Sequence, residues 1–166
     1  MKKLIIFTVN TLLFSFLNIS AAPSKPPINA SHRMDTNKTT EIDWCETYTD
    51  SSRLSKEQSK PLLILFTGTS WCPACIKLEK EILQKPEFIQ GVADNFIFYK
   101  AEFNDPSPEG LNSTPDSVLL DRYQITAFPT MVIVNEDGKQ LFTINYKPNT
   151  PDSYVREINQ KLQSSR

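Results

Sequence analysis

A run of five consecutive apolar residues at positions 62–66 most strongly restricts the fold of this chain. An unbroken run of this length predicts a strand that is buried on both faces of a sheet. Residues 67–70 are small or polar and break the pattern. From Cys75 onward, apolar residues recur at helical spacing, until Pro86 interrupts or kinks the helix. The sequence therefore predicts a strand, a short loop and a helix in direct succession.

Three further segments have the pattern of strands. The first begins with four apolar residues, the second is a continuous apolar run, and the third alternates after a hairpin turn. They lie at 96–103, 131–134 and 140–145. A short strand is also predicted around 42–45. We expect the last two long strands to pair as a hairpin, and earlier ones to be joined by helical crossovers, which parallel strands require.

The remaining segments predict helices and one long loop. Helices are expected at 51–59, 115–123 and 152–162. Thr114 offers a capping hydroxyl and is followed by a proline, which suits the first helical position. Residues 104–113 contain two prolines and a glycine and predict a loop. The order of elements predicts an α/β fold with a mixed central sheet flanked by helices on both faces.

The first 22 residues have the layout of a signal peptide. Lys2 and Lys3 precede an apolar stretch at 4–17, and the small residues at 20–22 suit cleavage after Ala21 or Ala22. The stretch is shorter than the roughly 20 residues that span a bilayer, and the alternative is an uncleaved membrane anchor. We therefore expect residues 1–22 to direct export, which makes the protein periplasmic or secreted.

The exported part of the chain is predicted to consist of a linker and one domain. Residues 23–40 are rich in proline, serine, asparagine and threonine, and predict a flexible linker. The folded domain is expected at 41–166, because 166 residues suffice for one domain with a core. The formal net charge of -1 implies no basic face, so we expect no nucleic-acid partner.

The chain contains three cysteines: one closely spaced pair and Cys45. The predicted loop places Cys72 at the N-terminus of a helix, where free backbone N–H groups and the helix dipole favour a thiolate. Cys75 lies one turn later, close enough to form a disulfide with Cys72. In this arrangement Cys72 would attack a substrate disulfide, and Cys75 would resolve the mixed disulfide.

The cysteines allow two interpretations besides disulfide exchange. The pair could be half of a zinc site, but zinc needs two more ligands, and the chain offers only Cys45 and His32, which lies in the predicted linker. A purely structural disulfide within this short spacing would stabilise little. We therefore predict no metal and no cofactor. Cys45 is interpreted as a buried core cysteine, and the alternative is a regulatory or intermolecular disulfide.

The motif Trp-Cys-Pro-Ala-Cys at 71–75, the Phe-Pro-Thr at 128–130 before a strand, and the order of elements resemble the thioredoxin superfamily. The resemblance covers residues 41–163. It implies a thioredoxin-like fold and a redox-active dithiol.

The resemblance also implies roles for residues outside the dithiol. Pro129 matches the cis-proline that faces the dithiol in this superfamily, where it exposes the backbone of the preceding residue, here Phe128, for pairing with a substrate peptide. Trp71 matches a residue that shields the active site and contacts partners. The alternatives are an ordinary trans proline and a tryptophan that only packs.

The sequence departs from thioredoxin in two respects. Thioredoxin carries a buried acid on the strand before the motif, whereas residues 62–66 are wholly apolar. Water or another group, with Glu102 on the next strand as a candidate, must then accept the proton of Cys75. The dipeptide between the cysteines is Pro-Ala and contains no histidine, which favours a reducing or intermediate potential. With the signal peptide and the run at 77–81, the motif resembles small exported Dsb-type reductases of the DsbH kind.

These features predict an exported thiol–disulfide oxidoreductase that acts on exported protein substrates, with a reductase favoured. A membrane thiol electron donor is implied, because an exported protein cannot reach cytosolic thioredoxin reductase. The alternatives are a disulfide oxidase or isomerase, and a thioredoxin-fold copper metallochaperone or assembly factor. Copper chaperones of this fold usually add a nearby histidine or methionine, but His32 lies far upstream and Met131 is expected to face the sheet. Isomerases of the family are often dimers that associate through an added domain. The sequence leaves no room for such a domain beside the predicted one, so we expect a monomer.

Overall fold

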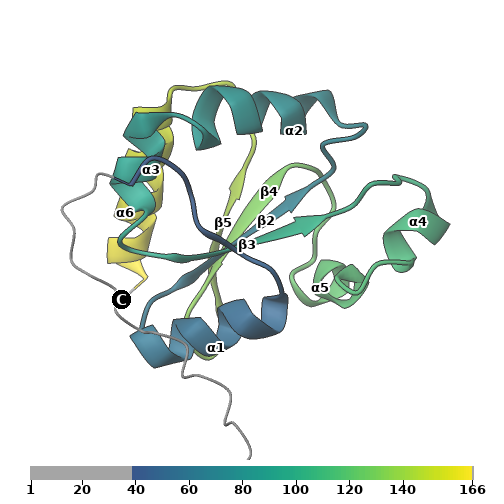
Figure 1. The fold of residues 1–166 in the computed structure, drawn as a ribbon, viewed down its shortest axis with the longest axis horizontal. Helices are drawn as coiled ribbons and strands as arrows, with labels where there is room; N and C mark the ends of the chain where they lie inside the picture. Colours follow the sequence, from purple (N-terminus) through teal and green to yellow (C-terminus); the bar gives the residue numbers. More distant parts are fainter. Residues whose placement is uncertain (1–38, 166) are drawn as a thin grey trace, which may run out of the picture. The chain divides into compact units, whose positions relative to one another are not determined.

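The computed structural model describes residues 39–165, whose strands form one mixed five-stranded sheet (Figure 1). The order across the sheet is β1-β3-β2-β4-β5. Its strands are β1 (Trp44–Cys45), β2 (Leu62–Thr67), β3 (Ile97–Glu102), β4 (Thr130–Val134) and β5 (Gln140–Asn145). The predicted signal peptide at 1–22 and most of the predicted linker at 23–40 lie outside the described residues.

The helices pack against both faces of this sheet, as predicted (Figure 1). One face carries α1 (Tyr48–Gln58) and α5 (Ser117–Arg122). The other carries α2 (Pro73–Leu78), its π-helical continuation η1 (Glu79–Leu83), α3 (Pro86–Val92) and α6 (Pro151–Ser164). Pro86 begins α3 and so interrupts the preceding helix, as the sequence indicated.

Strand β2 is the centre of the core. All six of its residues are buried, because β2 lies between β3 and β4 and helices cover both faces of the sheet there. Successive side chains alternate between the two faces: Leu63 and Leu65 pack with α2, α3 and α6, while Leu62, Ile64 and Phe66 pack on the side of α1 and α5. The apolar run is therefore continuous because both faces of the strand are covered.

One predicted crossover is wrong. The segment from α2 to α3 links the parallel strands β2 and β3, but α5 leads into β4, which runs antiparallel to β2. Length allows either direction, because the 27 residues between β3 and β4 exceed the dozen or so that a parallel crossover needs. The direction is set by strand pairing: β4 pairs antiparallel with both β2 and β5, whereas β2 runs parallel to β3. The chain therefore enters β4 from the same end of the sheet at which it leaves β3.

Two local predictions between β3 and β4 are also wrong. The predicted loop at 104–113 contains a short helix, α4 (Pro108–Asn112), because the Ser107 hydroxyl caps it by accepting from the Gly110 N–H at 3.0 Å. Thr114 does not cap the next helix. That helix, α5, begins at Ser117, and the buried Thr114 hydroxyl has no hydrogen-bond partner within the described part of the chain.

The first helix starts earlier than predicted, and this provides a test of its cap. The Thr47 hydroxyl accepts a hydrogen bond from the Asp50 N–H at 3.0 Å, so α1 begins at Tyr48. We expect Thr47→Ala to lower the free energy of unfolding by about 1 kcal/mol, measured by urea denaturation. Thr49→Ala is the matched control, because Thr49 is equally exposed but lies inside the helix, and should not destabilise. Equal losses in the two variants would contradict the capping role.

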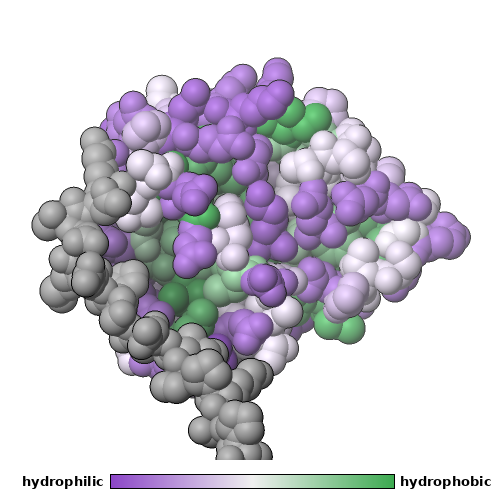
Figure 2. Space-filling view, in the orientation of Figure 1, coloured by the Kyte–Doolittle hydropathy of each residue, from purple (hydrophilic) through white to green (hydrophobic). Residues whose placement is uncertain are grey.

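Hydrophilic side chains cover most of the surface seen in Figure 2. The large hydrophobic side chains that are exposed in residues 39–165 are Ile76 and Val118, which are 36% and 68% exposed. None of the helices described is both long and apolar enough to cross a membrane.

Candidate active site

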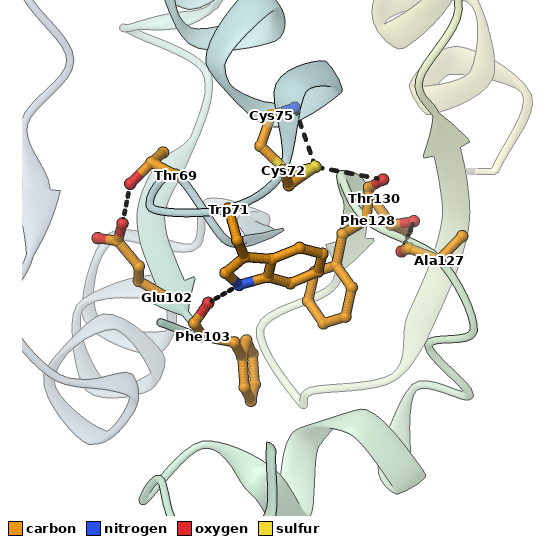
Figure 3. Close-up of a disulfide and its surroundings, with 9 residues drawn as sticks. All are labelled: Thr69, Trp71, Cys72, Cys75, Glu102, Phe103, Ala127, Phe128 and Thr130. Carbon is orange, nitrogen blue, oxygen red and sulfur yellow. Dashed lines mark hydrogen bonds between the residues drawn. A yellow bond between two sulfur atoms is a disulfide. The ribbon is translucent and has the colours of Figure 1, made fainter. Parts of the chain in front are cut away.

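The two cysteines of the motif lie where β2 gives way to α2. Cys72 has extended backbone angles and caps α2, with Pro73 at the first helical position. Its sulfur accepts a hydrogen bond from the Cys75 N–H at 3.2 Å, and the two sulfurs are joined in a disulfide (Figure 3). Cys72 is 5% exposed and Cys75 is 1% exposed. A partner therefore reaches Cys72 more easily than Cys75.

The loop before β4 faces the disulfide. The peptide bond between Phe128 and Pro129 is cis, and the Phe128 carbonyl oxygen lies 3.8 Å from the sulfur of Cys72 (Figure 3). The Thr130 hydroxyl donates to the carbonyl of Ala127 at 2.8 Å and so closes this loop on itself. The fold thus brings the backbone of Phe128 next to the sulfur of Cys72.

Trp71 forms one wall of the site. Its indole lies edge-on to Phe128, with ring centroids 5.6 Å apart, and its Nε1–H donates to the Phe103 carbonyl at 2.7 Å. The indole also lies against the backbone of Gly68, where an added Cβ would come within 2.5 Å of the ring. A glycine is therefore required at this point of the loop.

Glu102 occupies the last position of β3, beside the active-site loop. Its carboxylate accepts a hydrogen bond from the Thr69 hydroxyl and is turned towards that residue (Figure 3). Phe66, on the strand before the motif, is fully buried. The role of Glu102 as proton acceptor for Cys75 stays a prediction.

Two hydroxyls of the active-site loop were missed by the sequence analysis. Thr69 bonds to Glu102, and Ser70 donates to the Asn104 carbonyl at 2.9 Å. In the sequence, Thr69 and Ser70 could be recognised only as small polar residues that follow a strand. Such residues are common in any loop, and the acceptors lie more than thirty positions away, so the pattern could not reveal the pairing.

Cys45 is half-buried, and its prediction as a buried core residue is wrong. It lies on the two-residue edge strand β1, which pairs only with β3, so one side of the residue is left uncovered. It packs at the margin of the core on the side of α1. Partial burial raises the pKa of the Cys45 thiol, and the carboxylates of Asp43 and Asp50 raise it further.

The raised pKa predicts slow alkylation of Cys45. A higher pKa leaves less thiolate at a given pH, and the thiolate is the reacting species. With the other two cysteines oxidised, we expect iodoacetamide to modify Cys45 more slowly at pH 8 in the folded protein than in urea, with the pH–rate curve displaced to higher pH. Cys45→Ser should take up no label. Equal rates in the folded and unfolded states would contradict the prediction.

Metal binding requires several ligand side chains to lie close together. Within residues 39–165, no group of three or more histidine, cysteine, aspartate or glutamate side chains is placed to hold a metal ion. Met131 is buried in the core on β4, as expected. His32 lies outside the described residues.

A disulfide at a helix N-terminus, opposite a cis-proline loop on a mixed sheet, defines a thioredoxin-like thiol–disulfide oxidoreductase. The model of the thioredoxin-like domain family matches residues 49–154, and the chain belongs to this family.

Among known proteins, the similarity is to Dsb-type members of the superfamily. The chain is 30% identical over 123 residues to the disulfide bond reductase DsbH of Chlamydia pneumoniae, covering 73% of each protein. It is 29% identical to the thioredoxin-related protein DsbJ of the same organism, over 73% of this chain and 34% of that protein. A solved structure of a DsbH oxidoreductase superposes with a TM-score of 0.62 at 27% identity, covering 84% of this chain and 95% of the other. The chain is thus a Dsb-type member of the thioredoxin superfamily.

Proposed function

We propose that this protein is an exported protein-disulfide reductase whose dithiol is Cys72 and Cys75. The observation that carries the proposal is the position of the Cys72 sulfur, which caps α2, is the more exposed of the pair and lies beside the Phe128 carbonyl. Helix-end N–H groups stabilise a thiolate at this position.

In the first step, the Cys72 thiolate attacks one sulfur of a substrate disulfide. A bond forms between Cys72 and that sulfur, the substrate S–S bond breaks, and the second substrate sulfur leaves as a thiolate that takes up a proton. The Cys75 N–H, 3.2 Å from the Cys72 sulfur, stabilises the charge on Cys72 before the attack.

In the second step, Cys75 loses its proton and attacks the sulfur of Cys72. The mixed disulfide breaks, the substrate leaves with two thiols, and the protein is left with the Cys72–Cys75 disulfide. In the disulfide form that results, the Cα atoms of the pair are 5.2 Å apart, within the usual range for a disulfide. A thiol electron donor must then return two electrons and two protons.

The substrate would bind across Trp71 and the cis-proline loop. An extended peptide can pair with the backbone at Phe128, and its cystine sulfur then approaches Cys72 from the exposed side. Trp71 and Phe128 are half-buried and present aromatic surface beside Pro129, which suits docking of an unfolded or loosely folded segment.

The direction of electron flow is proposed from two features. No histidine stands between the cysteines to stabilise the reduced form and make the protein an oxidant. The relative with 30% identity is named a disulfide bond reductase. The predicted signal peptide supports a periplasmic or secreted location and a membrane thiol donor, and we propose that the protein acts as a monomer on exported protein substrates.

The redox potential and the turnover of a protein disulfide test this proposal together. We expect a potential near that of thioredoxin, about −270 mV, together with reduction of insulin when dithiothreitol regenerates the dithiol. A potential near about −120 mV would assign the protein to the oxidases. Tight copper binding without insulin reduction would instead indicate a metallochaperone.

A further inference from the structure

Three consecutive side chains of the active-site loop donate hydrogen bonds to three consecutive residues at the end of β3. The pairs are Thr69 with the Glu102 carboxylate, Ser70 with the Asn104 carbonyl and Trp71 with the Phe103 carbonyl. The last two distances are 2.9 Å and 2.7 Å. We call this set the loop anchor. Figure 3 shows the two pairs that include Thr69 and Trp71.

Within the loop anchor, only Glu102 accepts through its side chain. The other two acceptors are backbone carbonyls, which no substitution removes. A hydrogen bond to a carboxylate is also roughly twice as strong as one between neutral groups. Glu102 pairs in register with Thr67, the last residue of β2, so it lies beside the point at which the loop leaves the sheet. Glu102 is therefore the residue through which the anchor can be altered selectively.

The backbone of the loop connects this anchor to the dithiol. The Gly68 carbonyl accepts from the N–H groups of both Trp71 and Cys72, at 3.2 Å and 2.9 Å. The indole of Trp71 is packed between the Gly68 backbone and the ring of Phe128. Because the turn is closed by these bonds, a shift of Thr69 displaces the indole relative to the cis-proline loop.

We propose that Glu102, acting through Thr69, is a positioning residue that holds Trp71 in place for docking of a protein substrate. The inference rests on the proposed function of the dithiol. In the described part of the chain, the hydrogen bond of the Glu102 side chain goes to Thr69 and not to either cysteine. Loss of the carboxylate should therefore weaken binding of protein substrates and leave the reactivity of Cys72 towards a small disulfide unchanged.

Hydrogen exchange at the Trp71 indole measures the anchor directly. The protein has two tryptophans, so the Nε1–H signal of Trp44 serves as the internal reference. We expect Glu102→Ala and Thr69→Val each to speed exchange of the Trp71 Nε1–H by about tenfold or more, tenfold being the lower end of the range for one hydrogen bond to a charged group. The double variant should exchange no faster than either single variant, because both changes break one interaction. Thr69→Ser keeps the donor and should remain close to the wild type. Glu102→Gln keeps only a neutral acceptor, so its exchange rate should lie between those of the wild type and Glu102→Ala.

Steady-state kinetics separate positioning from chemistry. For insulin, Glu102→Ala and Thr69→Val should raise KM several-fold with little change in kcat, and Thr69→Ser should restore the wild-type KM. The rate with hydroxyethyl disulfide, which is too small to use the Trp71 surface, should stay the same in every variant. Thermal unfolding identifies any variant that fails to fold. If Glu102→Ala does not fold, Thr69→Val still tests the proposal.

Two results would overturn the inference. One is unchanged indole exchange and unchanged KM in both folded variants. The other is an equal loss of rate with insulin and hydroxyethyl disulfide, which would place Glu102 in proton transfer at the cysteines. If the wild-type protein reduced neither substrate, the proposed function would fail, and the exchange measurement would still decide whether Glu102 anchors Trp71.

Discussion

Replacement of Cys72 by serine is expected to lower insulin reduction by roughly 10⁴-fold or more, the scale seen when a catalytic nucleophile is removed. A serine hydroxyl is a far weaker nucleophile than a thiolate and forms no mixed disulfide. The turbidity of reduced insulin, with dithiothreitol as the source of electrons, measures the loss above the rate with dithiothreitol alone. Cys45→Ser is the matched control and should keep full activity, because Cys45 lies on β1, outside the active site.

Replacement of Cys75 by serine should have a different outcome. The nucleophile remains, but the mixed disulfide cannot be resolved, so a covalent complex of protein and substrate should accumulate and be released by dithiothreitol. Mass spectrometry of the complex identifies the linked cysteine. In the Cys45→Ser background, that cysteine can only be Cys72. A complex formed by Cys72→Ser and not by Cys75→Ser would reverse the assigned roles.

Truncation of Phe88 to alanine is expected to cost about 3–5 kcal/mol of unfolding free energy. Phe88 is fully buried on α3, in the core that α2, η1, α3 and α6 form with the sheet. Removal of its ring leaves a cavity that the close-packed surroundings fill only in part. Because a domain of this size is stabilised by only about 5–15 kcal/mol, urea denaturation should show a large shift of the midpoint.

The exposed residue Val118 provides the control for Phe88. Val118 is 68% exposed, so Val118→Ala should change the unfolding free energy by less than about 0.5 kcal/mol. The Phe88→Ala variant should still reduce insulin at a temperature where it remains folded, since Phe88 lies outside the active site. A loss in Phe88→Ala no larger than in Val118→Ala would mean that the helix α3 does not pack as described.

The parts of the fold that were predicted are those with a strong local pattern. The apolar run at 62–66 predicted the central strand because a strand covered on both faces must be apolar at every position. The spacing after Cys75 and the proline at 86 predicted the helix and its interruption. The sequence predicted that Thr114 caps a helix, but the residue at the N-cap of α5 is Asp116. The prediction was wrong because a hydroxyl followed by a proline is only one of several ways to begin a helix.

The direction of β4 could not be predicted in the same way. A helix between two strands is compatible with either direction, and here the direction is set by the antiparallel pairing of β4 with β2 and β5, which no local sequence pattern reveals. The burial of Cys45 was misjudged for a related reason. An apolar residue on a predicted strand is buried only if a neighbouring element covers it, and β1 is an edge strand of two residues.

The position of the dithiol could be inferred from local sequence, since a strand, a short loop and a helix that follow one another place Cys72 at a helix end through local geometry alone. Only the tertiary structure brought Phe128 to within 3.8 Å of the Cys72 sulfur, across 56 positions of the chain, and tied the loop at Thr69 to Glu102 across 33. Such contacts depend on which strands pair and in which register, and those are decided by the packing of the whole sheet. The dithiol motif can therefore be recognised from local sequence, whereas the surface around it, which we propose binds substrates, is formed by residues that only the folded sheet brings together.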